Sequence, residues 1–175
     1  HGRGYARISY AQDVEDLKTD EDDLPLPPGL VPEADRDALL VVFNGGFKPR
    51  HGNWGMKVRH QTLVPPRQKG CTVGLRGDGS VVIGSWIALA GAGDELVSYR
   101  QTPPCLVEHG EMHPDLEAHR DRAWGGHDPN RKTRRRSALG VDGTGRILLY
   151  GMGDEAEPRE LARGMRHAGA VAAAE

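Results

Sequence analysis

The sequence is short of aromatic residues, cysteine and long apolar runs, and each shortage argues against a class of protein. No run approaches roughly 18 consecutive apolar residues, so no membrane span is predicted. Cys71 and Cys105 are the only cysteines and form no Cys-x-x-Cys pattern, which argues against a zinc site built on sulfur. Trp124 is the only aromatic residue in the basic stretch 120–136, which is too little for stacking single-stranded bases. We therefore expect no nucleic-acid partner.

The composition is that of a soluble globular domain. Hydrophobic residues make up 37% of the 175 residues, and charged residues make up 27%. A chain of this length can form one domain with a substantial core and is too short to divide comfortably into two. The formal charge of -2 is unevenly distributed, since residues 1–37 hold ten acids and four bases whereas residues 120–136 hold seven bases and two acids. A local cationic field is therefore predicted around residues 120–136.

Residues 1–38 are predicted to be an acidic, proline-rich arm, and residues 39–175 are predicted to be the domain. Residues 13–23 hold seven acids in eleven positions, and the prolines between positions 25 and 28 disfavour regular structure. An acidic calcium loop is the alternative, but the acid spacing and central glycine of an EF-hand are missing. The chain opens on His1 without a visible signal peptide, and this absence says little about its location.

Two hairpins and a late helix predict an α+β fold. The hairpins, each with an Asp-Gly turn, are expected at 71–75 with 81–86 and at 137–141 with 146–150. Further strands are expected at 54–58, 95–100, 105–108 and 170–174. A helix is expected between Pro158 and Gly169. Its apolar stripe is Leu161, Ala162, Met165 and Ala168. We expect a mostly antiparallel β-sheet with at least one C-terminal helix packed on it.

The stretch from Leu39 to Gly52 carries the strongest local signal for a site. Leu39 to Phe43 is an apolar run without alternation, as in a strand covered on both faces. Asn44-Gly45-Gly46 then allows positive φ angles and brings backbone amides close to a ligand. Lys48, Arg50 and His51 follow, so the turn carries three candidate anion ligands. The alternative is a tight turn with a solvated basic tail.

The chemistry of the two cysteines is open on sequence alone. Cys71 and Cys105 each lie at the edge of an apolar run. Two buried free thiols are favoured over a disulfide or a minimal metal pair. A single disulfide would be only weak support for an oxidising compartment.

Four of the eight histidines lie between residues 109 and 127, which raises the question of a metal. His109, Glu111 and His113 resemble part of a metalloprotease motif, but Gly110 and Pro114 disfavour the helix that this motif requires. No transition-metal site and no cofactor are therefore predicted. A divalent cation is kept as an open alternative.

Several motifs occur in the order found in a known family. They are Asn44-Gly45-Gly46-Phe47, His51-Gly52, Gly55-Met56, Trp86 after Val-Val-Ile-Gly-Ser, Arg100-Gln101 before Pro-Pro-Cys-Leu-Val-Glu-His-Gly, Trp124-Gly125, Arg136-Ser137-Ala138-Leu139-Gly140, and the last helix with Gly169-Ala170. Together they resemble the phosphodiester glycosidase family over about residues 39–175. In that family an aspartate motif follows the last strand, and here Glu175 stands at its first position. The resemblance thus implies a domain truncated at its C-terminal end.

The resemblance implies hydrolysis of a sugar-1-phosphodiester bond. Arg136 would neutralise the phosphate by charge-assisted, bidentate contacts. Strand alternation turns Arg136 away from Arg135. Both Arg134 and Arg135 are expected to be solvated surface residues. The expected partner is a sugar-phosphate or glycan substrate.

The remaining catalytic and binding roles follow from the same resemblance. His51 or His127 would donate a proton to the leaving phosphate oxygen. Glu108 and Glu175 are candidates for the carboxylate that the sugar carbon requires, and the resemblance implies a better candidate in the aspartate that would follow Glu175. The predicted substrate-binding residues are Asn44, Gly45, Gly46, Phe47, Lys48 and Ser137.

The main alternative is a non-catalytic module on the same fold that binds carbohydrate or cell-wall glycan. Such a module would bind glycan saturably and release no product. Members of the family commonly act outside the cytoplasm, so an extracytoplasmic or secreted location is expected. The sequence leaves the sugar, the leaving group and the oligomeric state open.

Overall fold

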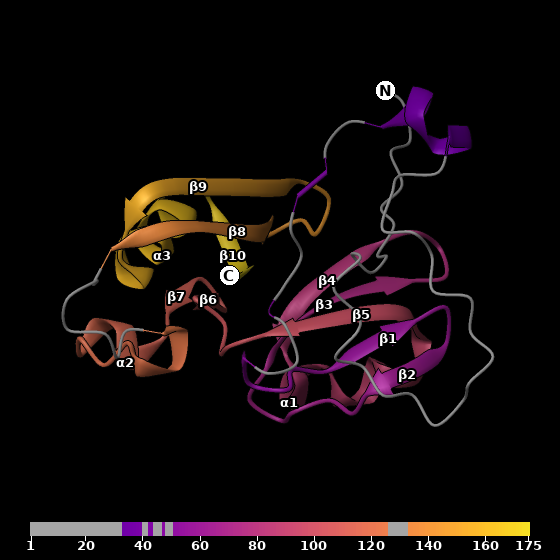
Figure 1. Ribbon diagram of the computed structural model, residues 1–175, viewed down its shortest axis with the longest axis horizontal. Helices are drawn as coiled ribbons and strands as arrows, with labels where there is room; N and C mark the ends of the chain where they lie inside the picture. The colour runs from indigo at the N-terminus through magenta and orange to yellow at the C-terminus, as the bar shows by residue number, and fades with distance from the viewer. Residues whose placement is uncertain (1–32, 40–41, 44–46, 48–50, 126–132) are drawn as a thin grey trace.

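The structure is a computed structural model that describes residues 33–39, 42–43, 47, 51–125 and 133–175. These residues form two five-stranded sheets whose strand pairings are antiparallel. Figure 1 shows sheet A on the right, in purple to magenta, and sheet B with helix α3 on the left, in orange to yellow. The predicted α+β fold, mostly antiparallel with a C-terminal helix, is confirmed.

The strands follow one another in sheet A in the order β2-β1-β5-β3-β4 and in sheet B in the order β7-β6-β10-β8-β9. Sheet A contains β1 (Met56–Val58), β2 (Gln61–Val64), β3 (Cys71–Arg76), β4 (Val81–Ser85) and β5 (Leu96–Thr102). Sheet B contains β6 (Val107–Glu108), β7 (Glu111–Met112), β8 (Arg134–Asp142), β9 (Leu148–Ala156) and β10 (Ala170–Ala174). The helices are α1 (Trp86–Leu89), α2 (Pro114–Glu117) and α3 (Pro158–His167), with 3-10 turns η2 (Glu33–Ala38), η4 (Ala90–Glu95) and η5 (Arg122–Trp124). Within the described residues, no helix has the length and apolar character needed to cross a membrane.

Both predicted hairpins are present, and the second is longer than expected. β3 and β4 form the first, and β8 and β9, with nine residues each, form the second. The extra length of β9 includes Gly151, where an added Cβ would lie 2.6 Å from Met165 Sδ. Glycine therefore lets α3 approach the sheet closely. Because glycine weakens the sequence signal of a strand, the pattern underestimates the extent of β9.

Helix α3 begins and ends where the sequence predicts. Glu157 and Glu160 form a capping box, in which the Glu157 amide donates to the Glu160 carboxylate at 2.8 Å. Pro158 occupies the first turn, where its missing amide is tolerated. Gly169 follows with a φ of 99°, which glycine adopts without strain. Of the predicted stripe only Ala168, at the C-terminal cap, is exposed.

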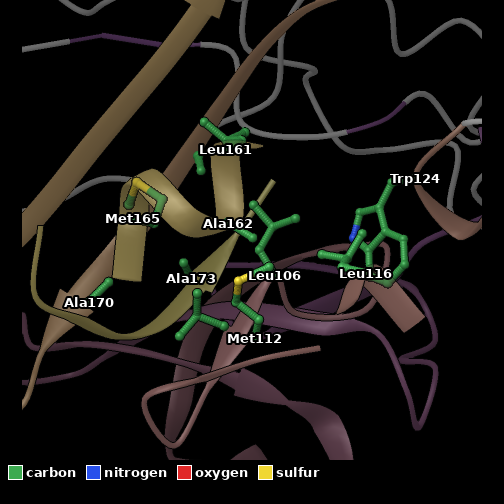
Figure 2. Packing of buried hydrophobic residues seen from close by; sticks show 11 residues of the cluster. Leu106, Met112, Leu116, Trp124, Leu161, Ala162, Met165, Ala170 and Ala173 are labelled. Carbon is green, nitrogen blue, oxygen red and sulfur yellow. The ribbon is translucent and has the colours of Figure 1, made fainter. Parts of the chain in front are cut away.

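The main core lies between α3 and sheet B (Figure 2). Leu161, Ala162 and Met165 of α3 pack against residues of β8, β10 and the segment that precedes β6. Trp124 is buried at one side of this core and donates its indole N–H to the Pro104 carbonyl at 2.9 Å. The indole therefore ties η5 to the core that supports sheet B.

A second core joins the two sheets. It contains Ile83 of β4, Val141 of β8 and Ala172 of β10, together with both cysteines. Cys71 and Cys105 form a disulfide, so the preference for free thiols is wrong. Cys71 pairs with Thr102 across β3 and β5, and the chain after β5 brings Cys105 back within reach. This proximity depends on a strand register that the spacing of two cysteines does not reveal.

The predicted buried strand from Leu39 to Phe43 is also corrected. Leu39 is 44% exposed and Val42 is 62% exposed, and neither lies in a strand. Phe43 is half-buried, with its ring centroid 5.0 Å from that of Tyr150 on β9. The described residues of this run therefore lie outside the sheets, although their apolar character is that of a buried strand.

Candidate functional site

Strand β8 sends two neighbouring arginines to opposite faces of sheet B. Arg135 has a side chain that is 77% exposed and pairs with Asp154 on β9 at 2.8 Å. Arg136 has a side chain that is 4% exposed. This alternation is the one predicted from the sequence, and it places Arg136 on the face that α3 covers.

The guanidinium of Arg136 is held by three elements. Its Nε donates to the Ala156 carbonyl at 3.0 Å, just before α3, and its Nη1 donates to the Trp124 carbonyl at 3.0 Å. Nη1 also forms an ion pair with Glu175 Oε1, just after β10. The side chain of Glu175 is 8% exposed, so both charges of this pair lie out of contact with water. A buried ion pair of this kind costs desolvation that its own attraction offsets only in part.

Four polar side-chain atoms are buried without a hydrogen-bond partner in the part of the chain that the structure describes. They are Arg134 Nε, Arg136 Nη2, Arg159 Nε and Glu175 Oε2. Arg134 precedes Arg136 by two residues on β8, and its charge acts on the Glu175 carboxyl, whereas Arg159 pairs with Glu157 in the first turn of α3. We call Arg134, Arg136 and Glu175 the Arg136 site. Buried unpartnered groups are rare, and an ion or a ligand is a common reason for them.

The surroundings of the Arg136 site shift the pKa of the Glu175 carboxyl. Burial raises the pKa of the Glu175 carboxyl, while the neighbouring Arg136 and, more weakly, Arg134 act in the opposite direction. Because its pKa is raised, Glu175 binds a proton more tightly in this site than a glutamate in water would. A carboxyl in this state can donate a proton as well as accept a hydrogen bond.

The expectation that Arg134 is a solvated surface residue is wrong. Its Nε is buried, it influences the Glu175 carboxyl, and its Nη1 lies 3.8 Å from the place of a Cβ on Gly125. Arg134 precedes Arg136 by two residues, so strand alternation could have assigned it to the same face.

Among the described residues, the other predicted site residues make no hydrogen bond or ion pair with the Arg136 side chain, and the rest fall outside the described ranges. Ser137 follows Arg136 on β8 and therefore lies on the opposite face, where it pairs with Met152. His51 is exposed and Phe47 is half-buried, and within the described residues no hydrogen bond or ion pair joins either of them to Arg136. The predicted site residues outside the described ranges are Asn44, Gly45, Gly46, Lys48 and His127.

Arg100 fastens the segment that follows the Asn-Gly-Gly motif onto sheet A. Its guanidinium donates to the carbonyls of Phe47, Trp54 and Gly55, the latter two at 3.0 and 3.4 Å. Burial lowers the pKa of Arg100. Arginine nevertheless stays charged, so these bonds are charge-assisted.

Gln101, the next residue, fastens the same segment through its side-chain amide. Its Oε1 accepts from the amides of Gly55 and Arg67 at 3.1 and 2.7 Å. Its Nε2 donates to the Arg67 carbonyl and to the Thr72 hydroxyl, both at 3.0 Å. Gln101 is fully buried with all of these bonds made, so the Arg100-Gln101 motif has a structural role here.

The second carboxylate candidate, Glu108, lies at a different place. Its Oε1 accepts from the Ser85 amide at 2.7 Å and so links β6 to the end of β4. Among the described residues, no group of three His, Cys, Asp or Glu side chains is arranged to hold a metal ion. Of the two carboxylates, Glu175 is therefore the one that lies beside the buried arginines.

Comparisons with known proteins give a distant structural likeness. No family model matches the chain, and no curated protein matches it in sequence. The chain is similar to the structure of the catalytic domain of zebrafish N-acetylglucosamine-1-phosphodiester alpha-N-acetylglucosaminidase (NAGPA), auto-inhibited by its pro-peptide, with 16% identity and a TM-score of 0.48. The similarity covers 68% of this chain and 43% of that chain, so the present chain spans less than half of the zebrafish domain.

Proposed function

We propose that the protein hydrolyses a glycosyl-1-phosphodiester bond at the Arg136 site. The observation that carries the proposal is the buried Arg136–Glu175 ion pair, with unpartnered donors on Arg134 and Arg136 and an unpartnered oxygen on Glu175. The motifs that resemble the phosphodiester glycosidase family agree with it, since Arg136 begins one of them and Glu175 stands at the start of another.

In the proposed reaction, the arginines bind the phosphate and Glu175 handles the proton. Arg136 Nη2 and Arg134 Nε donate to the phosphate oxygens and neutralise their charge, which stabilises phosphate as a leaving group. The buried Glu175 carboxylate, whose pKa is raised, accepts a proton from the attacking water. His51 and His127 remain candidate proton donors to the leaving oxygen.

The bond that breaks joins the sugar C1 to the phosphate oxygen. A water oxygen adds to C1, and the electron pair of the broken bond stays on the phosphate oxygen, whose charge the arginines neutralise. The water gives up one proton to Glu175, which releases it again when the phosphate monoester leaves. The products are a free sugar and a phosphate monoester. Binding and catalysis here need the buried guanidinium, because water would weaken its interaction with phosphate.

The test compares two neighbouring arginines in the full-length natural protein. A panel of methyl-phospho-sugars is supplied as substrate, and release of free sugar is measured for the wild type, Arg136→Lys and Arg135→Lys. Lysine retains the charge but loses the planar fork, so Arg136→Lys should lower kcat/KM by about tenfold to 100-fold, as expected for one or two charge-assisted hydrogen bonds. Arg135→Lys should stay within about twofold of the wild type, because its exposed ion pair contributes little.

Two results would contradict the proposal. A folded Arg136→Lys variant with wild-type kcat/KM would remove Arg136 from the reaction, and circular dichroism establishes whether the variant is folded. Saturable glycan binding without turnover of any member of the panel would favour a carbohydrate-binding module instead.

A further inference from the structure

The unpartnered atoms of the Arg136 site form a set of hydrogen-bond donors around one acidic group. Arg134 Nε and Arg136 Nη2 are donors, and Glu175 Oε2 is an acceptor when ionised and a donor when protonated. Arg136 is nine-tenths buried or more, so water does not satisfy its free nitrogen. A ligand that accepts several hydrogen bonds would satisfy both guanidinium groups.

We propose that the Arg136 site is a receptor for a phosphate monoester, which it binds together with one proton on Glu175. The proposal rests on the proposed function in one respect, that a phosphate monoester is the product released there. Its physical basis is the arrangement of the two arginines and Glu175, which is independent of turnover.

The charges around the site explain why a monoester and a proton belong together. Arg134 and Arg136 carry two positive charges and Glu175 carries one negative charge, which leaves a net charge of +1. A phosphate diester, with one negative charge, balances this without any proton. A phosphate monoester carries two negative charges and leaves an excess of -1, which one proton on Glu175 removes. Buried net charge is costly, so binding of the monoester should take up that proton.

The charged groups at the start of α3 are paired with one another and leave Glu175 to take up the proton. Arg159 Nη2 lies 3.9 Å from the carboxylate of Glu157, the cap of α3, and Arg159 Nη1 lies 2.7 Å from Nε2 of His119, which follows α2. Glu175 is the carboxyl with a buried, unpartnered oxygen.

Isothermal titration calorimetry of the full-length protein with methyl phosphate tests the proposal. The titration is run at about pH 8, well above the second phosphate pKa of about 6, so that the free ligand is a dianion. Runs in Tris and in HEPES, which differ in ionisation enthalpy, report the protons taken up. We expect saturable binding with uptake of about one proton by the wild type, and binding of dimethyl phosphate without uptake.

Three variants locate the ligand and the proton. Arg134→Gln should weaken methyl phosphate binding by about tenfold or more, and the matched control Arg135→Gln, on the opposite face of β8, should leave it unchanged. Glu175→Gln should still bind methyl phosphate but without proton uptake. Arg134 is only half-buried, so this variant keeps the test valid if substitution of Arg136 unfolds the protein.

Any of three results would overturn the proposal. They are the absence of saturable binding, equal weakening by Arg134→Gln and Arg135→Gln, or unchanged proton uptake in Glu175→Gln. These outcomes are separate from those of the turnover test, since a protein that hydrolyses no phosphodiester can still bind methyl phosphate with a proton.

Discussion

Loss of the disulfide between Cys71 and Cys105 should cost a large share of the stability of the fold. The two residues are separated by 34 positions, and the chain-entropy relation for a loop of that length gives about 4 kcal/mol. Domains are typically stable by about 5–15 kcal/mol, so this loss is substantial. The bond also lies in the core between the two sheets, and its reduction should therefore loosen their contact. For a chain of this size, the midpoint of thermal unfolding should fall by about 8–16 °C.

Urea unfolding of oxidised and reduced protein measures this loss directly. The protein is reduced while unfolded and refolded under reductant, because both cysteines are buried. The control is Cys71→Ala with Cys105→Ala, whose unfolding midpoint should not respond to reductant. Coincident unfolding curves for the oxidised and reduced wild type would refute the role that we assign to the cross-link.

Three further perturbations test the packing and the electrostatics. Burial lowers the pKa of His113, so its contribution to stability is full above the unfolded pKa of about 6.5 and is lost as the pH falls from that value through the lowered pKa of the folded protein. Acidification should therefore destabilise the wild type more than His113→Gln, as measured by urea unfolding at each pH. Met165→Ala should lower the free energy of unfolding by about 2–5 kcal/mol. The matched change Met152→Ala, at a side chain that is 63% exposed, should cost less than about 0.5 kcal/mol. Gly140→Ala should cost about 1–3 kcal/mol, because the new Cβ would lie 2.8 Å from Met165 Cε, and thermal unfolding would measure it.

Local patterns predicted the elements of the fold, whereas the division into two sheets depends on contacts far apart in the chain. The Asp-Gly turns and the stripe of α3 are short-range signals, and the hairpins and the helix are present. The place of β10 between β6 and β8 is a long-range choice that no local pattern contains. The same holds for the disulfide, which requires the register of β3 and β5. The apolar run from Leu39 shows the converse, because apolar character alone does not place a segment in a sheet.

The site could be predicted only in part for the same reason. Alternation along β8 identified Arg136 as a buried arginine among exposed ones, because its period of two is a property of any strand. Arg136 pairs with Glu175 because β10 lies beside β8. The two residues are 39 positions apart in the sequence, so no local pattern contains this contact.

The most direct test of the proposed function is to follow the oxygen of water during turnover. The full-length protein is incubated with a methyl-phospho-sugar in ¹⁸O-labelled water, and the products are analysed by mass spectrometry before the label exchanges. Attack at the sugar carbon predicts ¹⁸O in the sugar hydroxyl and an unlabelled methyl phosphate. Label in the phosphate would mean attack at phosphorus, and that result, or no turnover of any substrate in the panel, would contradict the account of the Arg136 site as a phosphodiester glycosidase site.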